Sequence, residues 1–467
     1  MAGKLKPFTL PEPAKDQNFS SIDPLDSRYY DIEISRYLSE QSRISYQAYM
    51  EAALAHALAD YGICSRKIAN EIEASARKVT AQEVYKEEQK TKHDIKALVN
   101  CIKKYVSKQA QPYVHFGATS YDIVASAQVL QMRSAINELV VPRLKNLNDV
   151  LIELTERYAG ATQIGRTHGQ HALPITFGFA VAEYVQRIGE CTQAIEALTS
   201  ELPGKFSGAV GAYNALSTFI DKPLEFEKTV LDYVGIMPSS YSTQILPPEY
   251  MVRLIDEQVI AAGIMANLAH DMRHLQRSEI GEVRERFETG QTGSSTMAHK
   301  RNPWNFENIV SMSKQIIAQG VNANLNLSSE HQRDLTDSAS SRFYSVVIAG
   351  IASMATRLCN VMSKLEVDEE AMQRNLNMSG GAIAAEPLYL LLAKYGHTSA
   401  HEKSKALAHK SLDSGKTLVE TIAADKEASA YWQKFTKKQQ QIIEYPEKYY
   451  TGLAAKKART VAKRWHI

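Results

Sequence analysis

The sequence predicts an all-α fold built around a central bundle of long helices, and two observations carry that prediction. Proline is absent from residues 25–111 and occurs only at Pro303 within residues 249–385, so long stretches are free to stay helical. Apolar side chains also recur every three or four residues, which is the spacing of a buried helix face. One such series is Val140, Leu144, Leu147, Leu151 and Leu154. Alternating β-branched runs are short, so we expect at most a small hairpin.

The N-terminal part divides into an extended arm, a turn and several helices. Residues 1–20 are polar and rich in proline, and the next ten residues are rich in turn formers. Alanine, leucine, glutamate and lysine dominate residues 25–111, which favours helices. We expect one of these helices to carry residues 91–96, with its adjacent charged side chains pointing around the helix surface.

Capping residues, proline and glycine mark the later boundaries. Residues 119–120, a threonine and a serine, predict a helix start. Pro142 lies near the start of the apolar series and should kink or break that helix. Residues 302–303, Asn-Pro, predict another start, with asparagine as the N-cap and proline at the first helical position. Two glycines at 380–381 predict a boundary, and the helical remainder ends in a basic tail that fits a solvated helix face.

Composition excludes several classes of function. A hydrophobic content of 44% with 23% charged residues is typical of a globular soluble protein. The net charge of +2 argues against nucleic-acid binding by phosphate neutralisation. The four cysteines are scattered without a CxxC pair, which indicates reduced thiols rather than disulfides or a zinc site. The N-terminus lacks the apolar core of a signal peptide, and we expect no membrane span and a cytoplasmic location.

The loop of residues 290–303 is rich in groups that bind anions and move protons. Gly290 and Gly293 allow backbone angles that other residues avoid. Two serines and two threonines supply hydroxyls, and Lys300 and Arg301 supply positive charge. An ordinary solvated linker between helices can have the same composition, so the composition alone leaves both interpretations open.

Two further clusters suggest proton transfer and anion binding. His168 lies beside a glycine and a threonine, and histidine gives or takes protons near neutral pH, although a structural role is an alternative. His168 and His171 have no cysteine or carboxylate at a ligand spacing, which argues against a metal site. Arg333 and Arg342, with Ser338 between them, suit a phosphate or carboxylate, and surface salt bridges explain them equally well. Neither GxxxxGK nor GxGxxG occurs.

The polar loop resembles a known family signature. Residues 293–303, Gly-Ser-Ser-Thr-Met-Ala-His-Lys-Arg-Asn-Pro, resemble the GSSxMPxKxNP signature of the fumarase/aspartase superfamily. Residues 115–120 and 165–170 resemble the other regions of the superfamily and occur in the same order. The segments that resemble the adenylosuccinate lyase family within it are 26–29, 91–94, 300–303 and 333–338.

The resemblance implies a fumarase/aspartase-like architecture and a reaction. The protein would be a homotetramer whose active sites are assembled from three subunits. Its domains would be an N-terminal helical domain with an extended arm (1–114), a central long-helix bundle (115–376) and a C-terminal helical domain (377–467). The reaction would be anti β-elimination of fumarate from adenylosuccinate, giving AMP, and from the succinyl-aminoimidazole carboxamide ribotide of purine synthesis. Neither a metal nor an organic cofactor is implied.

The same resemblance assigns roles to residues. Ser294, ionised with the help of Lys300, would remove the carbon-bound proton. His168 would protonate the leaving nitrogen, and Glu307 would orient His168. A glycine-containing loop suits closure over the substrate and exclusion of water. The implied ligands of the succinyl carboxylates are Thr119, Ser120, Ser295, Lys300 and Asn302. The implied phosphate and ribose side comprises Arg28, Tyr29, Arg333, Ser338 and Arg342. The further implied substrate contacts are Lys92, His93, Asp94, Gln244, Arg301 and Asn308.

Two positions depart from the family pattern, and two alternative functions remain. Ala298 replaces the usual proline of the signature, and Lys92 stands where many relatives carry arginine or asparagine. One alternative is another fumarate-releasing lyase, such as argininosuccinate lyase. The other is a non-catalytic helical relative, like the lens crystallins of the superfamily, and retention of the four implied catalytic residues argues against it.

Overall fold

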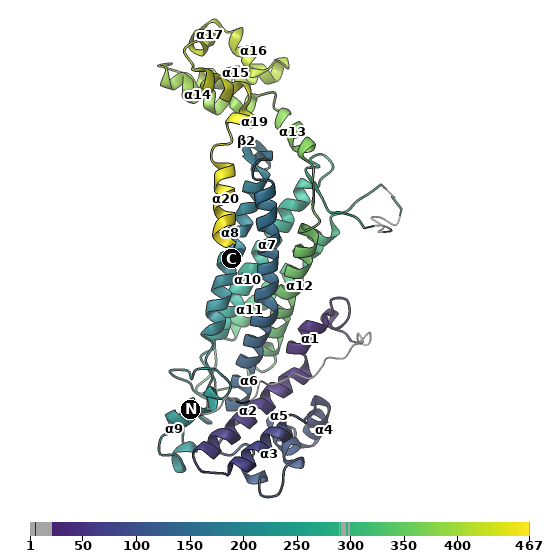
Figure 1. Cartoon of the computed structure of the whole chain (residues 1–467), viewed down its shortest axis with the longest axis vertical. Helices are drawn as coiled ribbons and strands as arrows, with labels where there is room; N and C mark the ends of the chain where they lie inside the picture. The colour runs from purple at the N-terminus through teal and green to yellow at the C-terminus, as the bar shows by residue number, and fades with distance from the viewer. Residues whose placement is uncertain (1–4, 6–20, 289, 291–295, 298, 467) are drawn as a thin grey trace. The chain divides into compact units, whose positions relative to one another are not determined.

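The computed structural model describes residues 5, 21–288, 290, 296–297 and 299–466, and it confirms the all-α prediction (Figure 1). The N-terminal elements are η1 (Pro24–Asp26), α1 (Ile32–Leu38), α2 (Glu40–Asp60), α3 (Arg66–Ala76), α4 (Ala81–Thr91), α5 (Asp94–Lys104) and η2 (Gln111–Tyr113). The long helices are α6 (Ser120–Ala135), α7 (Val141–Arg157), α8 (Phe177–Ser200), α10 (Glu249–Leu275), α11 (Trp304–Leu325) and α12 (Tyr344–Met362). Shorter elements between them are η4 (Leu216–Thr218), α9 (Pro223–Asp232) and η5 (Ser340–Phe343).

The C-terminal part is also helical. Its elements are α13 (Glu369–Asn377), η6 (Ala382–Ala384), α14 (Ala385–Lys394), α15 (Ala400–Ser414), α16 (Leu418–Ala423), α17 (Lys426–Trp432), α18 (Lys437–Glu444), α19 (Pro446–Tyr449) and α20 (Ala454–Trp465). Gly380 and Gly381 both have positive φ and separate α13 from η6, where the sequence predicted a boundary. These angles suit glycine, which has no Cβ to clash.

Strands are few, as expected. β1 (Thr162–Thr167) and β2 (Gln170–Thr176) form an antiparallel hairpin. β3 (Val283–Arg284) and β4 (Glu366–Val367) form a second antiparallel pair of only two residues each. A strand of two residues is too short to show alternating apolar and polar side chains, so the sequence could predict only the hairpin.

The apolar series at residues 140–154 is buried, as the helical spacing predicted. Its five members are at most 5% exposed. A π-helical turn, η3 (Ile136–Val140), joins α6 to α7 at the place where Pro142 was expected to disturb the helix. Proline has no N–H and its ring crowds the carbonyl of Glu138 four residues earlier, and a π turn widens the helix there. The chain therefore changes helical register instead of ending a helix.

The chain divides into two compact units. Unit 1 comprises the residues up to Leu144, Cys191–Gly263 and Ser311–Thr356. Unit 2 comprises Lys145–Glu190, Ile264–Val310 and the residues from Arg357 onward. Within unit 1, α2 packs against α3, α6 and α9. The three-domain division at residues 115 and 377 stays a prediction.

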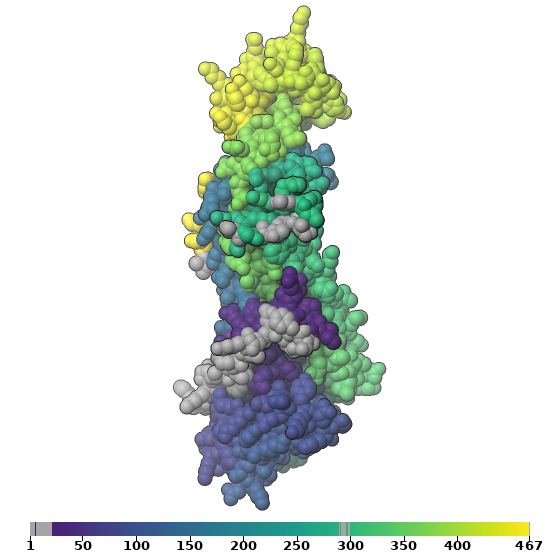
Figure 2. Space-filling model, turned by 90° about the vertical axis from the view of Figure 1, so that its right-hand side faces the viewer, coloured from purple at the N-terminus to yellow at the C-terminus, as the bar shows by residue number. Residues whose placement is uncertain are grey.

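Unit 2 has a core of its own among the C-terminal helices. Leu388, Leu392, Leu407, Ile422 and Ile443 are at most 2% exposed and belong to one cluster. Figure 2 shows α14–α18 as a continuous group of yellow-green atoms. The last helix, α20, returns beside α8 (Figure 1), where the indole Nε1 of Trp465 donates to Gln186 Oε1 at 2.8 Å.

Two local predictions were wrong in detail. Residues 91–96 do not lie in one helix: α4 ends at Thr91, Lys92 takes a left-handed φ of 53°, and His93 caps α5 by accepting from the Lys96 N–H. The charged side chains therefore lie at a junction between helices, and no glycine or proline marks it in the sequence. At the other site, α11 begins at Trp304, so Pro303 takes the cap position and its carbonyl accepts from the Glu307 N–H at 3.0 Å.

One helical segment meets the length and composition of a membrane span, which the sequence had not led us to expect. Residues Ser340–Met362 are long and apolar enough, and 61% of their most apolar window is buried inside the structure. The core helix of a water-soluble protein passes the same test, so this segment is weak support for a membrane role. The four cysteines are free, in line with the prediction of reduced thiols.

Candidate active site

A cavity of about 750 Å³ within unit 1 collects many of the residues that the sequence implied as substrate ligands. Its walls come from the start of α2, the α4–α5 junction, most of α6 and the segments 244–251 and 326–345. The predicted ligands that line it are Lys92, His93, Asp94, Thr119, Ser120, Gln244, Arg333, Ser338 and Arg342. Residues up to about 250 positions apart in the sequence thus meet around one space, which is large enough for a nucleotide-sized ligand.

Arg333 is the most distinctive group of this cavity. Its guanidinium carbon lies 3.3 Å from the centroid of the Tyr121 ring, and its side chain is only 7% exposed. Neither terminal nitrogen has a hydrogen-bond partner in the part of the chain that the structure describes. The carboxylate of Asp337 forms an ion pair with Nη2 at 3.6 Å, which is beyond hydrogen-bond range. Buried donors without hydrogen-bond partners favour a bound anion that accepts from them, because an unsatisfied buried donor is costly.

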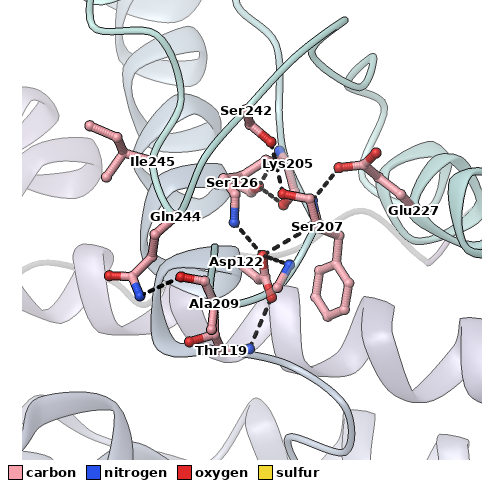
Figure 3. Close-up of polar contacts among 12 residues, drawn as sticks. Thr119, Asp122, Ser126, Lys205, Ser207, Ala209, Glu227, Ser242, Gln244 and Ile245 are labelled. Carbon is pink, nitrogen blue, oxygen red and sulfur yellow. Dashed lines mark hydrogen bonds and ion pairs between the residues drawn. The ribbon is translucent and has the colours of Figure 1, made fainter. Parts of the chain in front are cut away.

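The start of α6 is a second polar part of the cavity wall. Ser120 begins the helix and Thr119 precedes it. The first backbone N–H groups of a helix carry partial positive charge, so this end also attracts anions. The Asp122 carboxylate accepts from the Thr119 N–H at 2.9 Å and thereby caps the helix start that the sequence predicted at residues 119–120 (Figure 3).

A buried ion pair supports the loop before this turn. His115 has a positive φ of 65°, and its Nδ1 lies 2.6 Å from Glu51 Oε1, whose side chain is 0% exposed. Burial opposes protonation of His115, but the Glu51 carboxylate outweighs it and raises the pKa of His115 above its ordinary value. The pair links α2 to the loop that leads into α6.

Arg28 and Tyr29 lie in unit 1 but do not line the cavity. They follow η1 in a turn, in which the Tyr29 N–H donates to the Pro24 carbonyl at 2.9 Å. Arg28 is exposed. Their assignment to the phosphate and ribose side stays a prediction.

The remaining implied residues belong to unit 2, and the first of them is His168. It occupies the two-residue turn between β1 and β2 together with Gly169, and Thr167 pairs with Gln170 across it. Both turn residues have positive φ, 55° and 73°, as a type I′ turn requires. The imidazole is exposed at the tip of the hairpin, where a group from outside the subunit can reach it.

A buried carboxylate anchors this hairpin. Glu282 is 0% exposed, and both guanidinium nitrogens of Arg166 donate to it. Gln163 Nε2 and Asn375 Nδ2 each donate to Glu282 at 2.7 Å. Glu282 thus joins β1, which leads to His168, to α13 and to the start of the segment that runs toward the signature loop.

The signature loop is described only in part. Ser294, Ser295 and Ala298 lie outside the described residues. Lys300 and Arg301 are exposed, and Asn302 and Asn308 are half-buried.

The chain that follows the signature loop is held by Glu285. Its carboxylate accepts from Phe306 N at 3.0 Å and from Asn305 Nδ2 at 2.8 Å, which fixes the start of α11. Glu307, the next residue, forms an ion pair with Arg273 at 3.6 Å. Among the described residues, it makes no hydrogen bond or ion pair with His168. Its predicted role in orienting the catalytic histidine therefore stays a prediction.

Sequence reasoning gave no role to several residues that support these groups: Glu51, Tyr121, Asp122, Lys205 and Glu282. Tyr121 and Asp122 stood next to two predicted ligands, so their position could have drawn attention to them. No local sequence pattern distinguishes Lys205, Glu51 or Glu282, because burial of a charge depends on residues distant in the sequence.

Comparison with known proteins agrees with the fold. The model of a lyase family matches residues 26–318, and a model described as the C-terminal part of adenylosuccinate lyase matches residues 329–442. Among solved structures, a fumarate lyase from Mesorhizobium sp. BNC1 superposes with a TM-score of 0.83 at 23% identity, covering 93% of this chain and 98% of that one. The all-α fold of this chain is thus that of this helical lyase structure.

Proteins of similar sequence identify the family of lyases to which the chain belongs. Adenylosuccinate lyase of Methanocaldococcus jannaschii is 33% identical over 93% of this chain and 94% of its own length. That of Pyrococcus abyssi is 34% identical over 88% of this chain and 92% of its own. The chain belongs to the adenylosuccinate lyase family and is a lyase.

Proposed function

We propose that this protein is the adenylosuccinate lyase of purine nucleotide synthesis, acting as a cytoplasmic enzyme. It cleaves a carbon–nitrogen bond of adenylosuccinate to give AMP and fumarate. It also releases fumarate from the succinyl-aminoimidazole carboxamide ribotide, which shares the phosphoribosyl group and the succinyl-amine. No cofactor enters this chemistry, because a base, an acid and charge stabilisation suffice for the elimination.

The observation that carries this proposal is the buried guanidinium of Arg333 in a nucleotide-sized cavity, whose two terminal nitrogens have no hydrogen-bond partner among the described residues. An anionic group that enters the cavity would satisfy its two terminal nitrogens with charge-assisted hydrogen bonds. The start of α6 offers a second site for anions, at Thr119 and Ser120. Adenylosuccinate carries several anionic groups, a phosphate and two succinyl carboxylates, so a cavity with more than one anion-binding group suits it. Arg333, Ser338 and Arg342 take the phosphate in this proposal, and Thr119 and Ser120 take a carboxylate.

The proposed chemistry needs a base and an acid on opposite faces of the bond that breaks. Ser294 takes the proton from the carbon next to a carboxylate, and the electron pair forms the double bond of fumarate as the C–N bond breaks. His168 gives a proton to the departing nitrogen. Negative charge develops on the carboxylate during this step, so Lys300 and Asn302 act by stabilising it. Lys300 also favours the ionised form of Ser294, since a nearby cation favours an anion.

The proposed sites are shared between subunits of a homotetramer. The cavity belongs to unit 1, whereas His168, Lys300 and Glu307 belong to unit 2 and do not line it. In unit 1, α11 carries Ile317, Val321 and Leu325 at four-residue intervals, exposed by 45%, 61% and 74%. An exposed apolar stripe of this kind supports association with other copies. Light scattering with size-exclusion chromatography tests the number of subunits.

A fumarate-release assay tests the proposed activity. The purified protein is incubated separately with adenylosuccinate, with the carboxamide ribotide and with argininosuccinate, and fumarate is followed over time. We expect release from the first two substrates. Release from argininosuccinate alone would overturn the proposal in favour of a different lyase of the same superfamily, and no release from any of them would favour a non-catalytic relative.

A further inference from the structure

A fully buried ion pair between Lys205 and Asp122 lies next to the cavity residue Thr119 (Figure 3). Both side chains are 0% exposed. Asp122 Oδ1 accepts from the Lys205 ammonium and from the backbone N–H groups of Ser207 and Gly208, each at 3.1 Å. Its other oxygen accepts from the Thr119 N–H at 2.9 Å. The carboxylate therefore holds the α6 start and the 205–208 segment together.

The contacts continue from this pair to a second cavity residue, Gln244. The Ser126 hydroxyl of α6 donates to the Lys205 carbonyl at 2.8 Å and accepts from the Lys205 N–H at 3.0 Å. The Ser207 and Ser242 hydroxyls are 2.8 Å apart. Gln244 Nε2 donates to the Ala209 carbonyl at 2.8 Å (Figure 3). Three segments that are distant in the sequence are thus joined by one polar network.

Backbone packing shows how little freedom these segments have. Gly211 has a φ of 83°, and a Cβ at this position would lie 2.1 Å from the Ser242 carbonyl oxygen. The loop after Lys205 and the loop before Gln244 therefore touch through their main chains. A shift of one of them would displace the other, and with it the Gln244 side chain.

Stability alone is a poor explanation for this ion pair. The cost of removing two charges from water offsets much of their attraction, and apolar replacements of a buried pair are often as stable. The charged pair also fixes geometry, because both carboxylate oxygens of Asp122 accept from donors at defined places. The Lys205–Asp122 pair also has no net charge. A lone carboxylate at residue 122 would repel an anion bound at Thr119 and Ser120, and the Lys205 ammonium cancels that charge.

We propose that Lys205 and Asp122 are positioning residues that hold Thr119, Ser120 and Gln244 in place for the carboxylate end of the substrate and neutralise the wall behind them. The inference rests on the proposed function, since it assigns the α6 start to the succinyl carboxylates. Neither residue lines the cavity. Both act through the residues that do.

The double variant Asp122→Asn with Lys205→Met tests this role. It removes both charges together, so no unpaired buried charge is left to unfold the protein. The loss of charged hydrogen bonds to the α6 turn should raise KM about tenfold while kcat stays within about threefold. As inhibitors, fumarate should bind about tenfold more weakly and AMP within about twofold of wild type, because only the carboxylate end is disturbed. A folded double variant with wild-type KM and wild-type fumarate inhibition would overturn the proposal.

Matched variants separate positioning from general loosening. Tyr233→Phe removes a buried hydroxyl that donates to Asp60 in the same unit, away from the cavity, and should keep wild-type kinetics. If the double variant does not fold, Ser126→Ala removes the hydroxyl contacts to Lys205 without touching a charge, and KM should rise about threefold. An unchanged KM in Ser126→Ala would then overturn the proposal.

A failure of the proposed function would be distinguishable from a failure of this inference. Absence of fumarate release by the wild-type protein concerns the proposed function alone. Calorimetric titration of wild type and double variant with fumarate tests the positioning role directly. Weaker fumarate binding by the double variant would support the role, and equal binding would overturn it.

Discussion

Arg333 stacks on Tyr121, with its guanidinium carbon 3.3 Å from the ring centroid. Stacking restrains the plane of the guanidinium and leaves its edge for hydrogen bonds. Burial raises the pKa of Tyr121, and the Arg333 charge opposes that shift, so the ring stays a neutral support. The two residues come from α6 and from the segment after α11, and their meeting gives the cavity its cationic end.

Replacement of Arg333 by lysine should weaken AMP binding by at least about tenfold, because lysine keeps the charge but loses the planar fork and the stacking. Titration calorimetry with AMP measures this effect. The matched control is Arg36→Lys, since Arg36 also lies over a tyrosine ring, Tyr37, but is exposed and does not line the cavity. Equal affinities of Arg333→Lys and wild type would show that the phosphate binds elsewhere.

Loss of the proposed base or acid should abolish most of the turnover. We expect Ser294→Ala and His168→Ala each to lower kcat by at least about a hundredfold, as removal of a positioned proton-transfer group does. Light scattering should give the same number of subunits for each variant as for the wild-type protein. A variant that turns over at a wild-type rate would mean that its role is assigned to the wrong residue.

Mixing the two inactive proteins tests whether sites are shared. If Ser294 and His168 of one site come from different subunits, hybrid oligomers contain some sites with both residues intact. Mixed Ser294→Ala and His168→Ala proteins should then regain a measurable fraction of wild-type activity after subunit exchange. Exchange is verified by native mass spectrometry, and exchange without any recovery would contradict shared sites.

The His115–Glu51 pair should make stability depend on pH. The pKa of His115 is raised above its ordinary 6.5, so the folded protein holds the proton more tightly than the unfolded chain. The resulting stabilisation is fully present below pH 6.5 and is lost as the pH rises through the folded-state pKa. Glu51→Gln should therefore cost more unfolding free energy at about pH 6 than at about pH 9. Denaturant unfolding at both values measures this, and an equal cost at both would contradict it.

Glu282→Gln should loosen the hairpin that carries His168. Glutamine cannot match both nitrogens of Arg166, and breaking a buried ion pair costs about 3 kcal/mol. Hydrogen exchange should become faster in residues 162–176, and turnover should fall with it. Glu279→Gln is the matched control, because Glu279 is 73% exposed and pairs only loosely with Arg277 at 3.7 Å. Unchanged exchange in Glu282→Gln would mean that the hairpin is held by other contacts.

The helical architecture was open to prediction because helix spacing and proline distribution are local properties of the sequence. The apolar series at residues 140–154 could be recognised without knowledge of the residues that pack against it. The junction at Lys92 was missed, because a left-handed lysine leaves no trace in composition. The two-residue pairing of β3 with β4 was missed because strands this short leave no alternation in the sequence.

Family resemblance identified the candidate substrate ligands, but it did not identify the buried residues that hold those ligands in place. Thr119 and Arg333 belong to recognisable segments, but Lys205 and Glu282 act through partners about 80 to 120 residues away. Their function depends on which distant groups surround them, and no local pattern expresses that. The polar network behind the cavity therefore became visible only in three dimensions.

The positive φ of His168 has a consequence for the mutations that this position can accept. Asparagine and glycine adopt such an angle readily, whereas β-branched residues do not. A library of variants at residue 168 selected only for folded protein should thus be enriched in asparagine and glycine. The same library selected for growth that depends on the enzyme should keep histidine alone. The difference between the two selections would separate what the turn demands of this residue from what proton transfer demands.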